Sequence, residues 1–294
     1  MTTMQDMVND TRRLMYGSMT EKINRISVAA SGGVEEITLE FDITGINEGM
    51  IVSSGLNVWY VRAASVVDKK LFVIPGMEGA PSSGVAVGDI LRVKPRVTDW
   101  YLFSGLNDEI RSLSSPVNGL FALKSWTADV DPTYQSYDVP TAAASMITLL
   151  RVRYRLPGTP DVWVDLPNQA WRWHTGTNVN RIQLLRNIPV GTEVEFVYKG
   201  PFSAASSLST NVVTECGLAE SMVDIPPIGV AATLLRTTES RRTQIQTQGD
   251  ARRADEVPVS SNTAAAGQMM RYYEARINEE YSRLMARTPI FRGI

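Results

Sequence analysis

Four sets of residues in this 294-residue chain have the types or spacing that chemistry would need: a histidine, a cysteine, two aspartates and a group of tryptophans. His174 is the only histidine, which excludes metal sites with two or more histidine ligands. It lies on an expected strand or loop, and we interpret it as a structural or surface residue. Cys216 is the only cysteine, so an intramolecular disulfide is excluded, and we interpret it as a small buried hydrophobic residue.

Asp129 and Asp131 form an acidic pair that we expect in a loop. Paired carboxylates can bind a metal or act as acid and base. Two acids without further ligands are more typical of a solvated turn, which we favour. The sequence contains neither a Gly-x-Ser-x-Gly nucleophile elbow nor a phosphate-binding loop that ends in Lys-Ser or Lys-Thr. We therefore expect no catalytic residue, no metal and no cofactor, and we expect that the chain is not an enzyme.

Trp163, Trp171 and Trp173 lie close together in the sequence. Such a cluster can form a platform on which sugars or bases stack. Packing in the core and at the rim of a β-sandwich explains the cluster at least as well. Both interpretations stay open at this point.

The elements that must hold these residues predict an α+β fold with two antiparallel β modules. Apolar runs bounded by Gly and Pro predict short strands, for example over residues 37–43. Residues 35–96 are predicted to form a small barrel and residues 118–202 a jelly-roll-like sandwich. The remaining regions are expected to be an N-terminal helix and link (1–34), a helical connector (97–117), and C-terminal helices with an extended arm (203–294).

The C-terminal region carries a strong helical pattern. Apolar residues recur every three or four positions over residues 262–287, which places them on one helical face. They are Ala266, Met270, Tyr273, Ile277, Tyr281 and Leu284. Thr288-Pro289 ends the helix, because a residue before proline is disfavoured in the helical conformation. The apolar tail that follows contains Ile290, Phe291 and Ile294, and we expect it to dock on another protein.

A short apolar helix is predicted over residues 226–235, followed by an arginine-rich connector over 236–256. The connector includes Arg241, Arg242, Arg252 and Arg253, interleaved with acids. A solvated mixed-charge loop, a contact between subunits and a surface facing a DNA channel all fit this composition. We favour the subunit contact, because acids balance the cluster and arginines bind carboxylates through two parallel hydrogen bonds.

Composition limits the classes of protein. Hydrophobic residues make up 44% and charged residues 20%, as in ordinary globular proteins. The formal net charge of −2 argues against a dedicated nucleic-acid binder, which would normally be basic, but allows a protein that nucleic acid merely passes. No stretch approaches the roughly 20 apolar residues that span a bilayer, and the N-terminus lacks a signal-peptide pattern. We expect synthesis and folding in the cytoplasm.

Four runs of the sequence stand out beyond these patterns: residues 4–17, residues 106–113, residues 252–258 and the tyrosine-rich last helix. They resemble structural proteins of siphophage-like tailed bacteriophages. The resemblance implies a virion protein assembled in the host cytoplasm, and among such proteins the head-to-tail adaptor or connector of the neck is the nearest analogue. By that analogy, copies form a ring of about twelve between portal and tail. The implied partners are the portal and other neck or tail proteins, with DNA only as passing cargo and no membrane.

The resemblance also assigns contact roles to the C-terminal region. The residues expected to contact the portal or neighbouring subunits are Tyr273, Ile277, Tyr281, Leu284, Ile290, Phe291, Ile294, Arg241, Arg242, Arg252 and Arg253. The smallest adaptors are mostly helical, and this chain departs from them by carrying two β modules. The alternative function is therefore a collar- or tail-associated virion protein whose sandwich binds fibres or carbohydrate.

Overall fold

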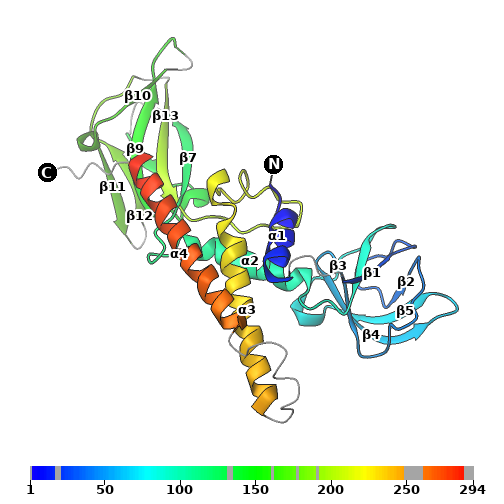
Figure 1. Ribbon diagram of the computed structural model, residues 1–294. Helices are drawn as coiled ribbons and strands as arrows, with labels where there is room; N and C mark the ends of the chain where they lie inside the picture. Colours follow the sequence, from blue (N-terminus) through cyan, green and yellow to red (C-terminus); the bar gives the residue numbers. More distant parts are fainter. Residues whose placement is uncertain are drawn as a thin grey trace. The chain divides into compact units, whose positions relative to one another are not determined.

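The computed structural model describes residues 2–16, 21–130, 135–159, 162–176, 179–189, 192–247 and 261–287, and their side chains except at 176, 179, 238–247, 261 and 262. The chain divides into two compact units (Figure 1). The first comprises Met1–Glu109, Ala204–Glu215 and Met222–Glu274. The second comprises Ile110–Ser203, Cys216–Ser221 and Ala275–Ile294. Each unit is thus assembled from segments that lie far apart in the sequence.

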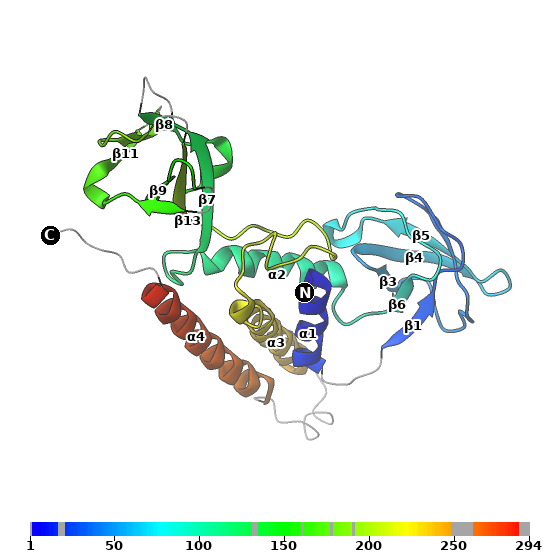
Figure 2. The same ribbon diagram turned by 90° about the horizontal axis from the view of Figure 1, so that it is seen from above.

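The first unit contains a small antiparallel barrel (Figure 2). Its strands are β1 (Lys22–Arg25), β2 (Glu36–Thr38), β3 (Ile51–Ser54), β4 (Asn57–Ser65), β5 (Lys70–Pro75) and β6 (Ile90–Val93). They are ordered β1-β6-β3-β4-β5-β2. A bridge between Ile26 and Leu39 joins the two edges of this sheet, and the Ser27 N–H donates to the Thr38 carbonyl at 2.9 Å. The sheet therefore closes on itself, which removes its exposed edges.

Alternation of side chains along the strands fills the barrel. Trp59, Leu71 and Leu91 are almost fully buried in its core. The predicted small barrel is confirmed, but the strand expected over 37–43 is too long. β2 ends at Thr38, and single backbone hydrogen bonds continue through Leu39 and Glu40. Beyond them, the buried Asn24 side chain bonds the backbone of residues 41 and 42 in place of a neighbouring strand. The short strands β1 and β3 were not predicted.

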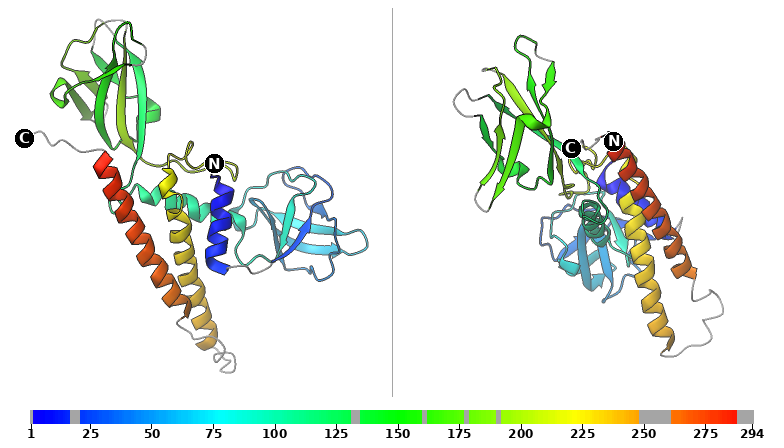
Figure 3. Two further views of the ribbon diagram at one scale, coloured as in Figure 1. Left: turned by 45° about the horizontal axis from the view of Figure 1, so that its top comes forward. Right: turned by 90° about the vertical axis from the view of Figure 1, so that its left-hand side faces the viewer.

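Helical segments accompany the barrel in the first unit. They include α1 (Met4–Tyr16), α3 (Ile225–Thr247) and α2 (Asp99–Leu113), of which α2 belongs to this unit up to Glu109. Helix α1 packs beside α3 (Figure 3). Met4, Met7 and Val8 are fully buried, as the helical pattern predicts. Leu14, expected on the same face, is 40% exposed. Thr11 is buried instead, and its burial is tolerated because its hydroxyl donates to the Met7 carbonyl at 2.8 Å.

An ion-pair network fixes the beginning of α2 in the first unit. Asp99, the first residue of α2, accepts a charge-assisted hydrogen bond from Arg12 of α1 and lies 3.5 Å from Nε of Arg92 on β6. Arg92 also pairs with Glu21 at 2.9 Å. A carboxylate at a helix N-terminus is favoured by the helix dipole. One side chain therefore connects the barrel, α1 and α2.

The second unit contains a two-sheet antiparallel sandwich. Its strands are β7 (Ala122–Asp129), β8 (Ser136–Asp138), β9 (Thr148–Arg155), β10 (Trp163–Asp165), β11 (Trp171–Gly176), β12 (Val179–Leu184) and β13 (Glu193–Gly200). One sheet is ordered β10-β9-β13-β7 and the other β11-β12-β8. Both contribute to one core, in which the Trp126 and Phe196 rings stack at 4.7 Å. The predicted α+β fold with two antiparallel β modules is confirmed.

The C-terminal helices differ from the prediction in one respect. α3 continues to Thr247, so the expected connector over 236–256 is wrong for its first half. The run after Val230 contains no Gly or Pro to end the helix, and its charged and polar residues are compatible with an exposed helix. The long last helix is confirmed as α4 (Ser261–Arg287). Within the described residues, no helix has both the length and the apolar content needed to cross a membrane.

A close approach of elements in the first unit explains the glycine at position 229 of α3. A Cβ atom there would lie 2.9 Å from both the Glu109 carboxylate and the Tyr273 ring. These neighbours come from α2 and α4, and the Tyr273 hydroxyl donates to the same carboxylate. Gly229 therefore lets three helices meet at one point.

We expect Gly229→Ala to lower the free energy of unfolding by about 1–3 kcal/mol, because the added methyl group must displace packed atoms. Gly267→Ala is the matched control, since a Cβ atom at that helical glycine meets nothing within 4 Å. The control should be neutral or stabilising by up to about 1 kcal/mol. Thermal unfolding followed by circular dichroism measures both. Equal effects at the two positions would contradict the packing argument.

Candidate interaction surfaces

The first half of α4 is anchored within the first unit. Ala266 is fully buried and Tyr273 is 8% exposed. The Tyr273 hydroxyl donates to Glu109, so this predicted contact residue is used inside the chain. Tyr272, its neighbour, is 56% exposed. The buried stripe on this half of the helix is therefore narrow.

The second half of α4 is anchored within the second unit by a buried carboxylate. Glu280 is 1% exposed and accepts hydrogen bonds from Ser221 at 2.9 Å and Arg283 at 2.9 Å. Arg276 lies 3.5 Å from it and also donates to the Ser221 carbonyl at 2.7 Å. A buried charge is tolerated when it is paired and hydrogen-bonded. This network was not predicted, although Glu280 follows Ile277 by three residues on the apolar face.

The residues expected to contact portal or subunits fall into three groups. Ile277 and Leu284 are 7% and 9% exposed, so they belong, like Tyr273, to the buried stripe of their own chain. Tyr281 is 42% exposed and also packs next to Gly119, where an added Cβ would lie 3.0 Å from the ring.

The third group has no described side chains. Arg241 and Arg242 lie in α3, outside the described side chains. Arg252, Arg253, Ile290, Phe291 and Ile294 lie outside the described residues. Their contacts with partners stay predictions.

The three tryptophans do not form one platform. Trp171 and Trp173, on β11, pack against the core of the sandwich, and the Trp173 indole donates to Asn180 at 2.8 Å. Trp163, on β10, pairs in register with Arg155, whereas its neighbour Val164 pairs with the core-facing Tyr154. Trp163 therefore lies on the outer face of the other sheet. The guanidinium groups of Arg153 and Arg155 lie 5.1 and 5.2 Å from the centre of its rings.

A ladder of opposite charges runs across this outer face. Arg153 of β9 pairs with Glu195 of β13, and Arg155 pairs with Glu193 at 2.7 Å. Burial by itself raises the pKa of Glu195, but hydrogen bonds from Arg153 and Ser125, together with the Arg153 charge, outweigh burial and lower it. The ladder was not predicted. The sequence does contain a signal for it: arginines at 151, 153 and 155 and glutamates at 193 and 195 recur at every second position, which places each set on one face of a strand.

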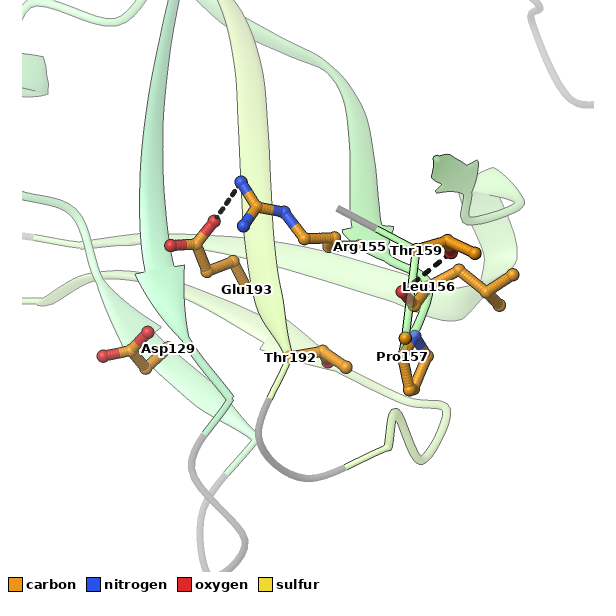
Figure 4. Close-up of a pocket in the computed structure, with 8 residues that line it drawn as sticks. Asp129, Arg155, Leu156, Pro157, Thr159, Thr192 and Glu193 are labelled. Atoms are coloured by element: carbon orange, nitrogen blue, oxygen red, sulfur yellow. Dashed lines mark hydrogen bonds and ion pairs between the residues drawn. The ribbon is translucent and has the colours of Figure 1, made fainter. Parts of the chain in front are cut away.

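A pocket of about 470 Å³ lies at one end of the sandwich (Figure 4). It is lined by residues 155–159 and by Asp129, Thr192 and Glu193. Asp129 is the last residue of β7, so the prediction of a loop is wrong for it, and Asp131 lies outside the described residues. Arg155 neutralises Glu193 in this pocket (Figure 4). Among the described residues, no group of three or more acids, histidines and cysteines could hold a metal ion.

His174 and Cys216 have the surroundings of structural residues. His174 is exposed on β11, with Nε2 3.3 Å from the Gln183 side-chain oxygen on β12. Cys216 is fully buried as a free cysteine, and its backbone carbonyl accepts a hydrogen bond from the Ser203 N–H at 3.0 Å. The sequence interpretations of both residues agree with these positions.

Similar solved structures include two chains from necks of GTA particles. One is from the neck of an empty GTA particle computed with C6 symmetry, with 18% identity, coverage of 58% of this chain and 77% of that chain, and a TM-score of 0.24. The other is from the neck of a native GTA particle computed with C12 symmetry, with 18% identity, coverage of 57% and 80%, and a TM-score of 0.23. Both TM-scores are low, so the similarity establishes neither a shared fold nor a shared role. No protein-family profile and no curated protein matches the chain.

The charge ladder gives a test that depends on pH. The lowered pKa of Glu195 means that its contribution to stability is present above its ordinary value of 4.5 and is lost as the pH falls through the lower folded value. We expect Glu195→Gln to destabilise the sandwich by about 1–2 kcal/mol at neutral pH. The difference from the wild type should shrink as the pH falls below 4.5.

Hydrogen exchange of the β9 and β13 amides, measured by mass spectrometry, reports this stability. Glu193→Gln is the matched control, because the Arg155–Glu193 side chains are 39% and 37% exposed and such a surface pair contributes only about 0–1 kcal/mol. If Glu195→Gln lowers the stability of the sandwich equally at acidic and neutral pH, the stabilising role of the ionised Glu195 carboxylate is contradicted.

Proposed function

We propose that this chain is a non-enzymatic structural protein of a tailed-phage virion, and that its copies form a ring in the neck between portal and tail. The proposal is carried by the geometry of α4. This helix has 27 residues, a length of about 40 Å, which is long for a helix in a protein of this size. Side chains on one stripe hold it to its own chain, and most of its remaining side chains are exposed.

The exposed surface of α4 suits a docking helix. Tyr272 is 56% exposed on it, and tyrosine is among the residues that dominate binding energy at interfaces. The resemblance of the sequence to siphophage virion proteins includes this tyrosine-rich helix and supports the same role. The net charge of −2 fits a ring that DNA passes without being held.

The alternative is a collar- or tail-associated protein whose sandwich binds fibres or carbohydrate, and the tryptophans give it less support than one shared platform would. Trp163 lies on the other sheet from Trp171 and Trp173. Trp163 already has two guanidinium groups next to its rings.

Inactivation of the gene in the phage tests the proposal. We expect lysates with filled heads and separate tails, visible by electron microscopy, and joined particles when the protein is supplied from a plasmid. Joined, infectious particles without the protein would contradict the proposal.

The same complementation assay tests the helix. Tyr272→Ala should lower the yield of joined particles about tenfold, which corresponds to the loss of one interface contact of about 1.4 kcal/mol. Tyr101→Ala is the matched control, because Tyr101 is also a helical tyrosine and is 50% exposed, on α2. Thermal unfolding should be unchanged for both variants. Equal yields for the two would show that α4 is not the docking helix.

A further inference from the structure

Two surfaces of this chain are complementary in both charge and apolar character, although they belong to different units. The first, here called the Phe41 loop, consists of Glu40, Phe41 and Asp42 on the barrel. The second, here called the Lys199 patch, consists of Leu123, Ile147, Arg151 and Lys199 on the sandwich. Each surface has a property that a single copy does not explain.

The Phe41 loop presents an aromatic ring to solvent on a rigid support. Phe41 is 51% exposed, whereas Leu39 and Ile43 on either side are buried in the barrel core. The buried side chain of Asn24 accepts the Phe41 N–H at 3.1 Å and donates to the Asp42 carbonyl at 3.3 Å. An exposed aromatic side chain on a fixed backbone loses little conformational entropy on binding.

Two carboxylates flank this ring. Glu40 and Asp42 are both exposed. The Thr44 backbone N–H and the Thr44 hydroxyl both donate to the Asp42 carboxylate, at 3.0 and 2.8 Å, and lower its pKa. Asp42 is therefore ionised at neutral pH. The loop combines an apolar anchor with negative charge.

The Lys199 patch combines a desolvated cation with exposed apolar residues. Lys199 is on the outer face of β13 and is only 8% exposed, with its ammonium 4.0 Å from the centre of the Phe121 ring. Within the part of the chain that the structure describes, no carboxylate pairs with it. Burial lowers its pKa, as expected for a cation that has lost water without gaining a counter-charge.

One apolar residue lies opposite this cation on β7, and another directly precedes β9. Leu123 of β7 pairs in register with Lys199 and is 52% exposed. Ile147 is 47% exposed, and its N–H donates to the Lys199 carbonyl at 2.8 Å. Arg151 is exposed on β9, next to them, and adds a second positive charge.

We propose that the Phe41 loop of one copy docks on the Lys199 patch of the next copy, with the Phe41 ring against Leu123 and Ile147. The Asp42 carboxylate then meets the Lys199 ammonium, and Glu40 meets Arg151. The charges of the two surfaces match, and the Lys199 ammonium gains a counter-charge that none of the described residues supplies. Because the two surfaces differ, the contact is head-to-tail, and such a contact forms a ring when the rotation from copy to copy closes. This inference rests on the proposed ring.

Two variants, each with one added cysteine, test the contact in the particle itself. Phe41→Cys and Leu123→Cys are expressed together in cells infected with phage that lacks the gene, and purified particles are then oxidised mildly. We expect a disulfide-linked dimer that contains one copy of each variant. The wild-type protein is the control, because its one cysteine, Cys216, is fully buried.

The possible results separate the two hypotheses. If the variants enter the particle without forming the mixed dimer, the proposed contact is wrong and the neck function stands. If the protein is absent from particles even as wild type, the proposed function fails, and the contact fails with it.

A charge exchange provides a second readout. Asp42→Lys alone and Lys199→Asp alone should each lower incorporation into particles about tenfold, and the double variant should restore most of it. Arg172→Asp, at an exposed arginine of β11 on the other sheet, is the matched control and should have no effect. Thermal unfolding identifies any variant that fails to fold, and the cysteine experiment remains decisive for that case. Single variants that enter normally, or a double variant without recovery, would overturn the proposed pairing.

Discussion

The carboxylate of Asp99 is the interaction on which the first unit depends most. It lies at the N-terminus of α2, where the helix dipole favours a negative charge, and it is 4% exposed. Arg12 and Arg92 approach it from α1 and from the barrel. A buried carboxylate that lost these partners would be an uncompensated charge, which costs several kcal/mol. The arrangement therefore fixes which side of α2 faces the barrel within this unit.

Neighbouring contacts of Thr98 make the same junction specific. The Thr98 hydroxyl accepts the Tyr101 N–H at 3.3 Å, so it caps the first turn of α2, and it donates to Glu78 at 2.7 Å. The Trp100 indole donates to the Glu78 carbonyl at 3.1 Å. One turn of helix thus binds the segment that follows β5 as well as the strand β6. A barrel held in this way can present a rigid surface such as the Phe41 loop.

Elements with a strong apolar periodicity could be predicted from the sequence. Elements that depend on polar contacts could not. The alternation around Ile37 and the stripe from Ala266 to Leu284 located the barrel and α4, because burial of apolar side chains follows the period of the element. β1 was missed because Asn24 is its one buried residue and owes its burial to hydrogen bonds with the Phe41 loop. The extension of α3 was missed because an exposed helix has no apolar period to detect.

The candidate surfaces were predicted less well for the same reason. Tyr273, Ile277 and Leu284 were recognised as one face, but the sequence could not tell whether that face meets its own chain or a partner. The structure shows that it is buried in the chain and leaves Tyr272 exposed. The desolvated ammonium of Lys199 could not be predicted from the sequence, because its desolvation depends on Phe121, which is 78 positions away.

The most direct test of the central claim is co-sedimentation of the purified full-length protein with isolated portal rings of its phage, with the mass of each species determined alone and in the mixture. The neck assignment predicts that the protein joins the portal ring as a multimer of fixed stoichiometry. A protein that sediments separately from the portal and keeps its own mass in the mixture would contradict it.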